Sequence, residues 1–188
     1  MKKFLSVLLV LTFVAGNSYA IDLIPKLSIC LPGTFRSDYE VDTAYNIGAE
    51  ARVPLSEHWV FGFGFDYLIN RRLGMGKKAM AESFGQDQYY TSKQFSMLPV
   101  FISIMVYPFG SFGEYKPYLR IDGGYNVLFT IDNGKNSSGG LYVAGGVGFE
   151  LFDRYIVELY ASRYEAKDND NDITYKDIFF KVGYKFSL

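Results

Sequence analysis

The sequence predicts an all-β fold, an eight-stranded antiparallel up-and-down β-barrel, and three observations support this prediction. Apolar and polar residues alternate in many short segments, which is the pattern of strands with one apolar and one polar face. Tight turns alternate with longer polar connections along the chain. Phenylalanine, tyrosine and tryptophan make up 18% of the residues, and aromatic side chains favour strands over helices.

Length and charge limit the class of protein. A chain of 188 residues predicts one domain. The formal net charge of -1 argues against a nucleic-acid-binding protein, which would normally carry a basic surplus.

The first twenty residues have the pattern of a cleavable signal peptide. Lys2 and Lys3 precede an apolar run over residues 5–16, and Ser18-Tyr19-Ala20 offers small residues for cleavage. We therefore expect a signal peptide over 1–20 and a single barrel domain over 21–188. The single cysteine, Cys30, cannot form a disulfide within the chain.

Eight segments are predicted to be strands, and most of them alternate between apolar and polar residues, although residues 95–107 are apolar on both faces. They cover residues 26–31, 45–53, 59–70, 95–107, 117–129, 141–151, 155–162 and 180–188. In the second of them, Tyr45 and Ile47 share one face, while Asn46, Glu50 and Arg52 share the other. The last is apolar at every second position, namely Phe180, Val182, Tyr184, Phe186 and Leu188.

Alternation does not by itself decide whether the apolar face points outward to lipid or inward, as in a soluble lipocalin-like barrel. The polar face is rich in small residues with few charges, which favours a crowded interior over a water-exposed surface. Aromatic residues near the strand ends are predicted to form two girdles at the membrane interfaces. They are Trp59, Tyr107, Tyr118, Phe152 and Tyr155 at one end, and Tyr45, Tyr67, Phe129, Tyr164 and Tyr175 at the other.

The final segment, FKVGYKFSL, resembles the C-terminal signature of bacterial outer-membrane barrels, although that signature normally ends on an aromatic residue and this chain ends on Leu188. Residues 21–188 resemble the small eight-stranded barrels of the OmpX and OmpA transmembrane-domain group. The resemblance implies an integral protein of the outer membrane of a Gram-negative-type bacterium, with both chain ends in the periplasm. It also implies a monomer that contacts outer-membrane lipid and lipopolysaccharide and is assembled by the barrel-assembly machinery.

Charged residues on the inward face predict a lumen plugged by ion pairs. An eight-stranded barrel is only wide enough for side chains to fill, and buried charges require partners. The predicted lumen charges are Glu50, Arg52, Asp66, Arg120, Asp122, Glu158, Lys181 and Lys185. The alternative is a narrow, porin-like polar path for ions or small solutes.

The residues that could support catalysis or metal binding are few. The one histidine, His58, lies in a tight turn near Ser56, so neither catalytic residues nor an enzyme are expected. Asp168, Asp170 and Asp172 resemble the start of a calcium loop, but Ile173 stands where that loop needs glycine. We therefore expect no metal and no cofactor.

Two arginines and one loop are the candidate sites of surface interaction. Arg71 and Arg163 are predicted to face outward near the outer rim, where guanidinium groups could contact lipopolysaccharide phosphates. The loop from Gly74 to Lys93 combines charges with aromatic residues and could bind an extracellular partner. The sequence thus predicts a structural or surface-interaction protein.

Overall fold

The computed structural model describes residues 21–31, 33–35, 39–41, 43–75, 94–110, 114–131, 137–168 and 171–188. Side chains are described for 21–31, 43, 45–68, 96–110, 114–127, 139–166 and 174–188. Within the described chain there is no helix long and apolar enough to cross a membrane. The predicted signal peptide, residues 1–20, lies outside the described residues.

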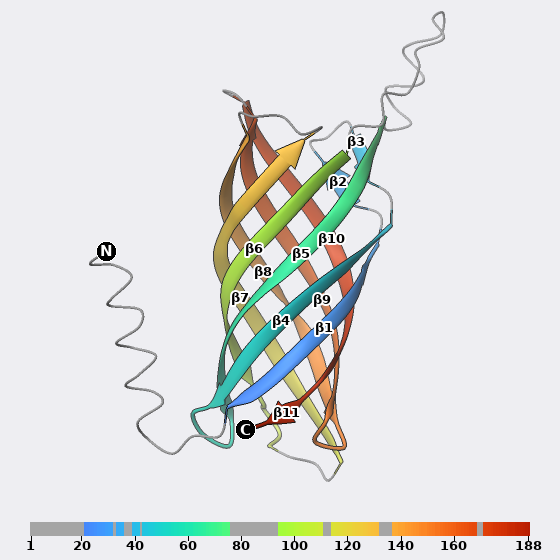
Figure 1. The fold of residues 1–188 in the computed structure, drawn as a ribbon. Coiled ribbons are helices and arrows are strands. Elements are labelled where there is room, and N and C mark those ends of the chain that lie inside the picture. The colour runs from blue at the N-terminus through green and yellow to red at the C-terminus, as the bar shows by residue number, and fades with distance from the viewer. Residues whose placement is uncertain are drawn as a thin grey trace, which may run out of the picture.

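Eight long strands form the wall of a closed barrel, and they are tilted relative to its axis (Figure 1). Each pairs antiparallel with its neighbours, and the last wall strand pairs with the first, so the predicted eight-stranded antiparallel barrel is confirmed. The strands are β1 (Asp22–Cys30), β4 (Ala44–Pro54), β5 (Trp59–Met75), β6 (Gln94–Val106), β7 (Tyr115–Ile131), β8 (Ser137–Leu151), β9 (Tyr155–Asp168) and β10 (Asn171–Tyr184).

Two short strands extend the wall between β1 and β4. They are β2 (Gly33–Phe35) and β3 (Tyr39–Val41), and they lie in a stretch that the sequence pattern predicted only as a connection. β2 pairs with β10, and β3 pairs with β5. Because β1 and β4 are shorter than β10 and β5, this hairpin supplies hydrogen-bond partners where the two long strands continue.

The seam between β1 and β10 closes the barrel. Its register runs from Lys26 opposite Gly183 to Cys30 opposite Phe179. The predicted terminal strand is therefore part of the wall, but it begins at Asn171 and is interrupted at Lys185. The N–H of Lys185 donates to the carbonyl of Arg154 (2.7 Å) instead, and the short β11 (Phe186–Ser187) resumes pairing with β1.

The two faces of the wall differ in chemistry. In β1, Leu23, Leu27 and Ile29 are exposed on the outside, while Lys26 and Ser28 are buried inside. Large apolar side chains are exposed on all eight wall strands. A continuous apolar exterior around a polar interior is the arrangement of a transmembrane barrel, because lipid then covers the apolar surface.

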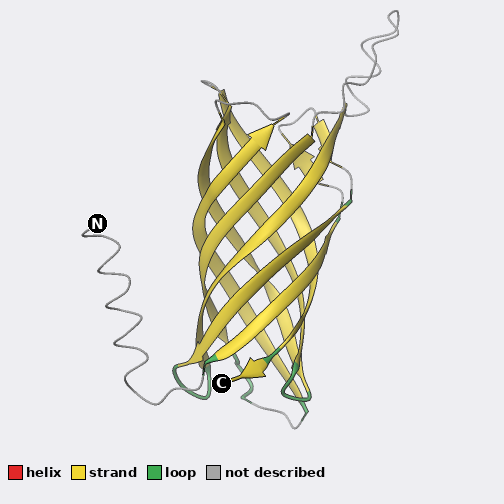
Figure 2. Cartoon of the chain, in the orientation of Figure 1, coloured by secondary structure: helices red, strands yellow, loops and turns green. Residues whose placement is uncertain are grey.

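Short turns join the strands at one end of the barrel (Figure 2). At the β8–β9 turn, Phe152 and Asp153 have φ of 53° and 58°, and the N–H of Arg154 donates to the carbonyl of Leu151. Positive φ at both central positions is the geometry of the tight hairpin turn that suits strand twist. Because outer-membrane barrels carry their short turns on the periplasmic side, we assign this end to the periplasm.

Inward glycines make room for large side chains from neighbouring strands. A Cβ atom at Gly148 would lie 2.3 Å from the Tyr118 ring, and one at Gly146 would lie 2.3 Å from Cβ of Tyr160. A Cβ at Gly62 would lie 2.2 Å from Oγ of Ser103. The glycines of the polar face are therefore needed because other side chains already occupy the interior.

The predicted aromatic girdles are only partly correct. Trp59, Phe152, Tyr155 and Tyr45 are exposed on the outside, as a girdle requires. The prediction was wrong for four tyrosines that lie buried inside the barrel, because their position in the alternation points them inward: Tyr107, Tyr118, Tyr164 and Tyr175. Tyr67 is partly buried, and the side chain of Phe129 lies outside the described residues.

Candidate functional site: the barrel interior

A layer of charged side chains crosses the interior. It consists of Lys26 from β1, Glu50 and Arg52 from β4, Arg120 from β7 and Glu158 from β9, each at most 4% exposed. In the strand order, β1 and β7 stand on opposite sides of the wall. Contacts within this group, which we call the ion-pair layer, therefore span the lumen.

The two glutamates are each shared by the same three cations. Glu50 accepts hydrogen bonds from Lys26, from Nε of Arg52 (3.0 Å) and from Nη1 of Arg120 (2.7 Å). Glu158 accepts from Lys26 (2.8 Å), Nη2 of Arg52 (2.6 Å) and Nη1 of Arg120 (2.7 Å). Such sharing gives each buried carboxylate several charge-assisted partners, which offsets the cost of removing it from water.

Two further carboxylates extend the network. Nε of Arg120 donates to Oδ1 of Asp122 (2.7 Å), and Lys181 forms an ion pair with Asp66. Asp122 lies two residues farther than Arg120 along β7 from the periplasmic end, so it lies on the extracellular side of the layer. The network then contains four cations and four carboxylates, and two other buried carboxylates among the described residues, Glu150 and Asp177, are contacted by Lys185 and Cys30.

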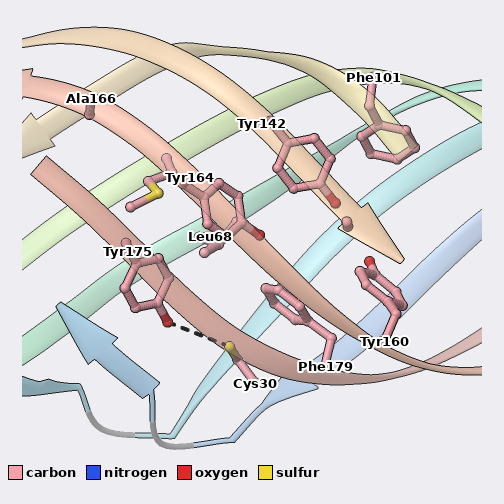
Figure 3. Close-up of a cluster of buried hydrophobic side chains, with 11 residues drawn as sticks. Cys30, Leu68, Phe101, Tyr142, Tyr160, Tyr164, Ala166, Tyr175 and Phe179 are labelled. Carbon is pink, nitrogen blue, oxygen red and sulfur yellow. Dashed lines mark hydrogen bonds between the residues drawn. The ribbon is translucent and has the colours of Figure 1, made fainter. Parts of the chain in front are cut away.

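Aromatic side chains pack together inside the barrel (Figure 3). Tyr142, Tyr164 and Tyr175 lie near the extracellular ends of their strands, beyond the ion-pair layer. The ring centroids of Tyr142 and Tyr164 are 4.9 Å apart, and those of Tyr164 and Tyr175 are 5.5 Å apart. Lys181 joins the two groups, since its Nζ lies 4.6 Å from the ring centroid of Tyr160. Cation–π contacts thus connect the charged and aromatic parts of the interior.

Cys30 is buried within this aromatic part of the lumen. Its thiol donates to Oδ2 of Asp177 (2.7 Å), and its sulfur lies 3.7 Å from the hydroxyl of Tyr175 (Figure 3). Asp177 also accepts a hydrogen bond from Ser162.

The periplasmic end has its own ion pairs. Lys185 bonds to Glu150 and lies 3.8 Å from Asp22. Lys116 lies 2.5 Å from Asp153, a carboxylate in the exposed β8–β9 turn. The hydrogen bond from Lys116 lowers the pKa of Asp153 below its ordinary value.

The structure brings most of the predicted lumen charges together. Glu50, Arg52, Asp66, Arg120, Asp122, Glu158 and Lys181 are all buried inside, whereas Lys185 is half-buried at the periplasmic end. Sequence reasoning missed Lys26, Glu150 and Asp177 as members of the interior charges. The apolar residues Leu27 and Ile29, predicted to face outward, would have placed Lys26 and Ser28 inward by alternation.

The turn histidine makes structural contacts. Nδ1 of His58 lies 2.9 Å from the carbonyl oxygen of Tyr107, and Ser56 accepts hydrogen bonds from the backbone N–H groups of His58 (3.3 Å) and Trp59 (3.1 Å). Among the described residues, no group of three or more histidine, cysteine, aspartate or glutamate side chains is placed to hold a metal. Asp170 lies outside the described residues, as do the side chains of Asp168 and Asp172.

Solved structures with the same architecture include two outer-membrane proteins. OprG from Pseudomonas aeruginosa superposes with a TM-score of 0.55 at 12% identity, covering 89% of this chain and 96% of OprG. Neisserial surface protein A superposes with a TM-score of 0.55 at 13% identity, covering 88% of this chain and 97% of that protein. This chain has the fold of the eight-stranded outer-membrane β-barrels.

At these identities the likeness shows the fold alone. No protein-family model matches the sequence, and no curated protein matches it. The predicted outer-membrane location agrees with the apolar exterior of this barrel and with the fold it shares.

The candidate surface sites of the outer-membrane barrel are only partly described. Arg163 is exposed on the outer face of β9, and its Nη2 lies 2.8 Å from Oε1 of Glu165. The side chain of Arg71 lies outside the described residues, and so does most of the loop from Gly74 to Lys93. In the terminal segment, Phe180, Val182, Phe186 and Leu188 are exposed on the outside, as predicted for a lipid-facing strand, whereas Tyr184 is half-buried.

Proposed function

We propose that this protein is a non-enzymatic outer-membrane barrel with a closed polar lumen, and that it acts as a structural or surface-interaction protein through its extracellular loops. The observation that carries the closed lumen is the sharing of Glu50 and Glu158 by three cations from different parts of the wall. A permeating ion would have to separate several of these contacts at once. Breaking one partner from a buried ion pair costs about 3–5 kcal/mol.

Packing supports the same proposal. The hydroxyl of Tyr118 donates to Glu158 (2.6 Å), and its ring occupies the space beside Gly148. An eight-stranded barrel has an interior that side chains can fill completely. Large side chains such as Tyr118 therefore fill the space that the charged side chains leave in the interior.

The extracellular end is the part that we propose meets partners. The exposed guanidinium of Arg163 has the planar geometry that suits lipopolysaccharide phosphates, and Glu165 holds it in place. The loop from Gly74 to Lys93 offers aromatic and charged residues to an extracellular partner.

The absence of catalysis is part of the proposal. His58 uses its ring nitrogen on a backbone carbonyl at the periplasmic turn, and the hydroxyl of Ser56 accepts from two backbone N–H groups. A nucleophile and its base would instead need a hydrogen bond between their side chains.

Planar-bilayer conductance of the refolded barrel, residues 21–188, tests the closed lumen. Heat-shifted gel mobility confirms folding before each recording. We expect folded, inserted protein to give no discrete current steps. Reproducible steps from the folded form would contradict the closed lumen.

A narrow channel for ions or small solutes is the second candidate. The observation that favours it is a set of buried polar atoms that make no hydrogen bond to another described residue: both amide atoms of Asn46, Nδ2 of Asn126, and the hydroxyls of Tyr142 and Tyr164. Buried polar groups of this kind are commonly satisfied by water. If water continues past the ion-pair layer, Arg120→Gln changes the current; in a closed barrel it changes only stability.

A further inference from the structure

The periplasmic end of the barrel contains a cavity of about 450 Å³. Its inner end includes Arg52 of the ion-pair layer, and its wall includes Tyr107, Lys116, Glu150 and Lys185. We call this cavity the periplasmic vestibule. Its volume is in the range of pockets for small molecules.

Arg52 has unused hydrogen-bonding capacity at the inner end of the vestibule. Its Nε donates to Glu50, and its Nη2 donates to Glu158 and Tyr118. Its Nη1 makes no hydrogen bond to another described residue, although the side chain is only 2% exposed. A buried guanidinium nitrogen left without an acceptor costs free energy, so an acceptor delivered by a ligand would be favourable.

Two of the three carboxylates that line the vestibule, Asp22 and Glu150, have cations beside them, and the third, Glu57, is exposed in the β4–β5 turn. Lys185 contacts Glu150 and Asp22, and Lys116 lies 4.0 Å from Glu150. These pairs neutralise Asp22 and Glu150. The strongest partner of Lys116 is Asp153, which is 66% exposed, so Lys116 can exchange this solvent-exposed contact for a ligand.

The charges of the ion-pair layer balance one another. The ion-pair layer holds three cations against two glutamates, and Asp122 balances the third cation from the extracellular side. With Asp122 included the layer is neutral, so the attraction for an anion comes from Nη1 of Arg52 and from Lys116. Guanidinium groups in a partly enclosed site bind carboxylates and phosphates in preference to neutral ligands.

We propose that the periplasmic vestibule is a binding site for a small oxyanion, a carboxylate or a phosphate, with Nη1 of Arg52 as the inner donor and Lys116 as the second cation. The ligand enters from the periplasm and stops at the ion-pair layer. The site does not depend on whether the loops bind a partner or the lumen conducts.

Nuclear magnetic resonance titration of the refolded barrel, residues 21–188, in a non-ionic detergent tests the proposal. Inorganic phosphate and acetate are added separately at low chloride concentration, because salt screens the interaction. We expect saturable shifts of the Arg52 Nε–H signal and of the amides of Lys116 and Glu150. The anion that saturates at lower concentration identifies the ligand class, and absence of saturable shifts with both anions would overturn the proposal.

Arg52→Lys and Arg120→Lys form a matched pair. Both change a buried arginine of the same layer, but only Arg52 lines the vestibule. Loss of one charge-assisted hydrogen bond predicts about tenfold weaker binding in Arg52→Lys and little change in Arg120→Lys. Equal weakening in both variants would show that the layer, and not the vestibule, governs the shifts.

Lys116→Met provides a test outside the ion-pair layer if Arg52→Lys does not fold. We expect anion binding to weaken several-fold, because one of the two cations is removed while the layer stays intact. If Lys116→Met binds the anion with unchanged affinity, Lys116 is not the second cation and the proposed vestibule site is wrong.

Discussion

The ring of Tyr118 on β7 occupies the space beside Gly148 on β8, where a Cβ atom would lie 2.3 Å from the ring. The same tyrosine donates its hydroxyl to Glu158 (2.6 Å). The absence of a side chain at Gly148 therefore allows the position of the Tyr118 ring, and from this position Tyr118 contacts the ion-pair layer.

Gly148→Ala is expected to destabilise the barrel. The added methyl group would displace the Tyr118 ring, and overpacking of a filled interior costs about 1–3 kcal/mol. Denaturant unfolding of the protein in detergent measures the loss.

Gly145→Ala is the matched control on the same strand. A Cβ atom there would come no closer than 3.6 Å to the carbonyl oxygen of Arg120, an ordinary contact. We expect a change within about 0.5 kcal/mol. An equal loss in both variants would mean that backbone freedom, and not packing against Tyr118, explains the glycine.

Glu158→Gln should be strongly destabilising. It removes one of two glutamates that Lys26, Arg52 and Arg120 share, leaving buried cations without compensation. A loss of about 3–5 kcal/mol is expected in the unfolding free energy.

The exposed pair of Arg163 and Glu165 provides the control for this variant. Glu165→Gln removes a carboxylate that is 41% exposed, where ion pairs contribute about 0–1 kcal/mol. If Glu158→Gln lowers the unfolding free energy no more than Glu165→Gln does, the interior is more hydrated than a closed lumen allows.

Asp66 and Lys181 should be energetically coupled. Asp66→Asn or Lys181→Met alone leaves one buried charge unpaired, whereas the double variant removes both. The double variant is therefore expected to lose about 0.5–3 kcal/mol less than the sum of the single losses. Additive losses in a double-mutant cycle would indicate that each charge has another adequate partner.

The thiol of Cys30 should report folding. It is 0% exposed inside the barrel, so a maleimide should not modify it in the folded protein and should modify it rapidly after unfolding. A Glu57→Cys substitution in the exposed turn, made in a Cys30→Ala background, should react in both states. Rapid modification of Cys30 in protein with folded gel mobility would show that the extracellular half of the lumen is open to solutes.

Alternation predicted the wall well, because lipid outside and a packed lumen inside impose opposite chemistry on successive residues. Alternation also predicted the inward orientation of residues that we had assigned to the aromatic girdles. Arg163 points outward, so Tyr164, the next residue along β9, must point inward, where the structure places it.

Other features depend on geometry that residue order does not contain. The contact of Arg120 with Glu50 depends on the tilt and stagger of strands that are not adjacent, and these follow from the closed barrel as a whole. The β2–β3 hairpin arises because β1 and β4 are short, which becomes evident only once β5 and β10 are seen to continue beyond them. The vestibule likewise requires side chains from several strands to meet.

The pairing between β1 and β10, which closes the barrel, is shorter than the pairing between β9 and β10. β1 pairs with β10 from Lys26 to Cys30, with one further hydrogen bond from Leu31 to Ile178, and β11 pairs only with Asp22 and Leu23. In contrast, β9 and β10 pair from Asp168 to Tyr155 without a break. Because fewer backbone bonds hold this junction than hold the β9–β10 pair, we expect it to separate before that pair under strain. Amide protons at this junction should therefore exchange with solvent sooner than those between β9 and β10.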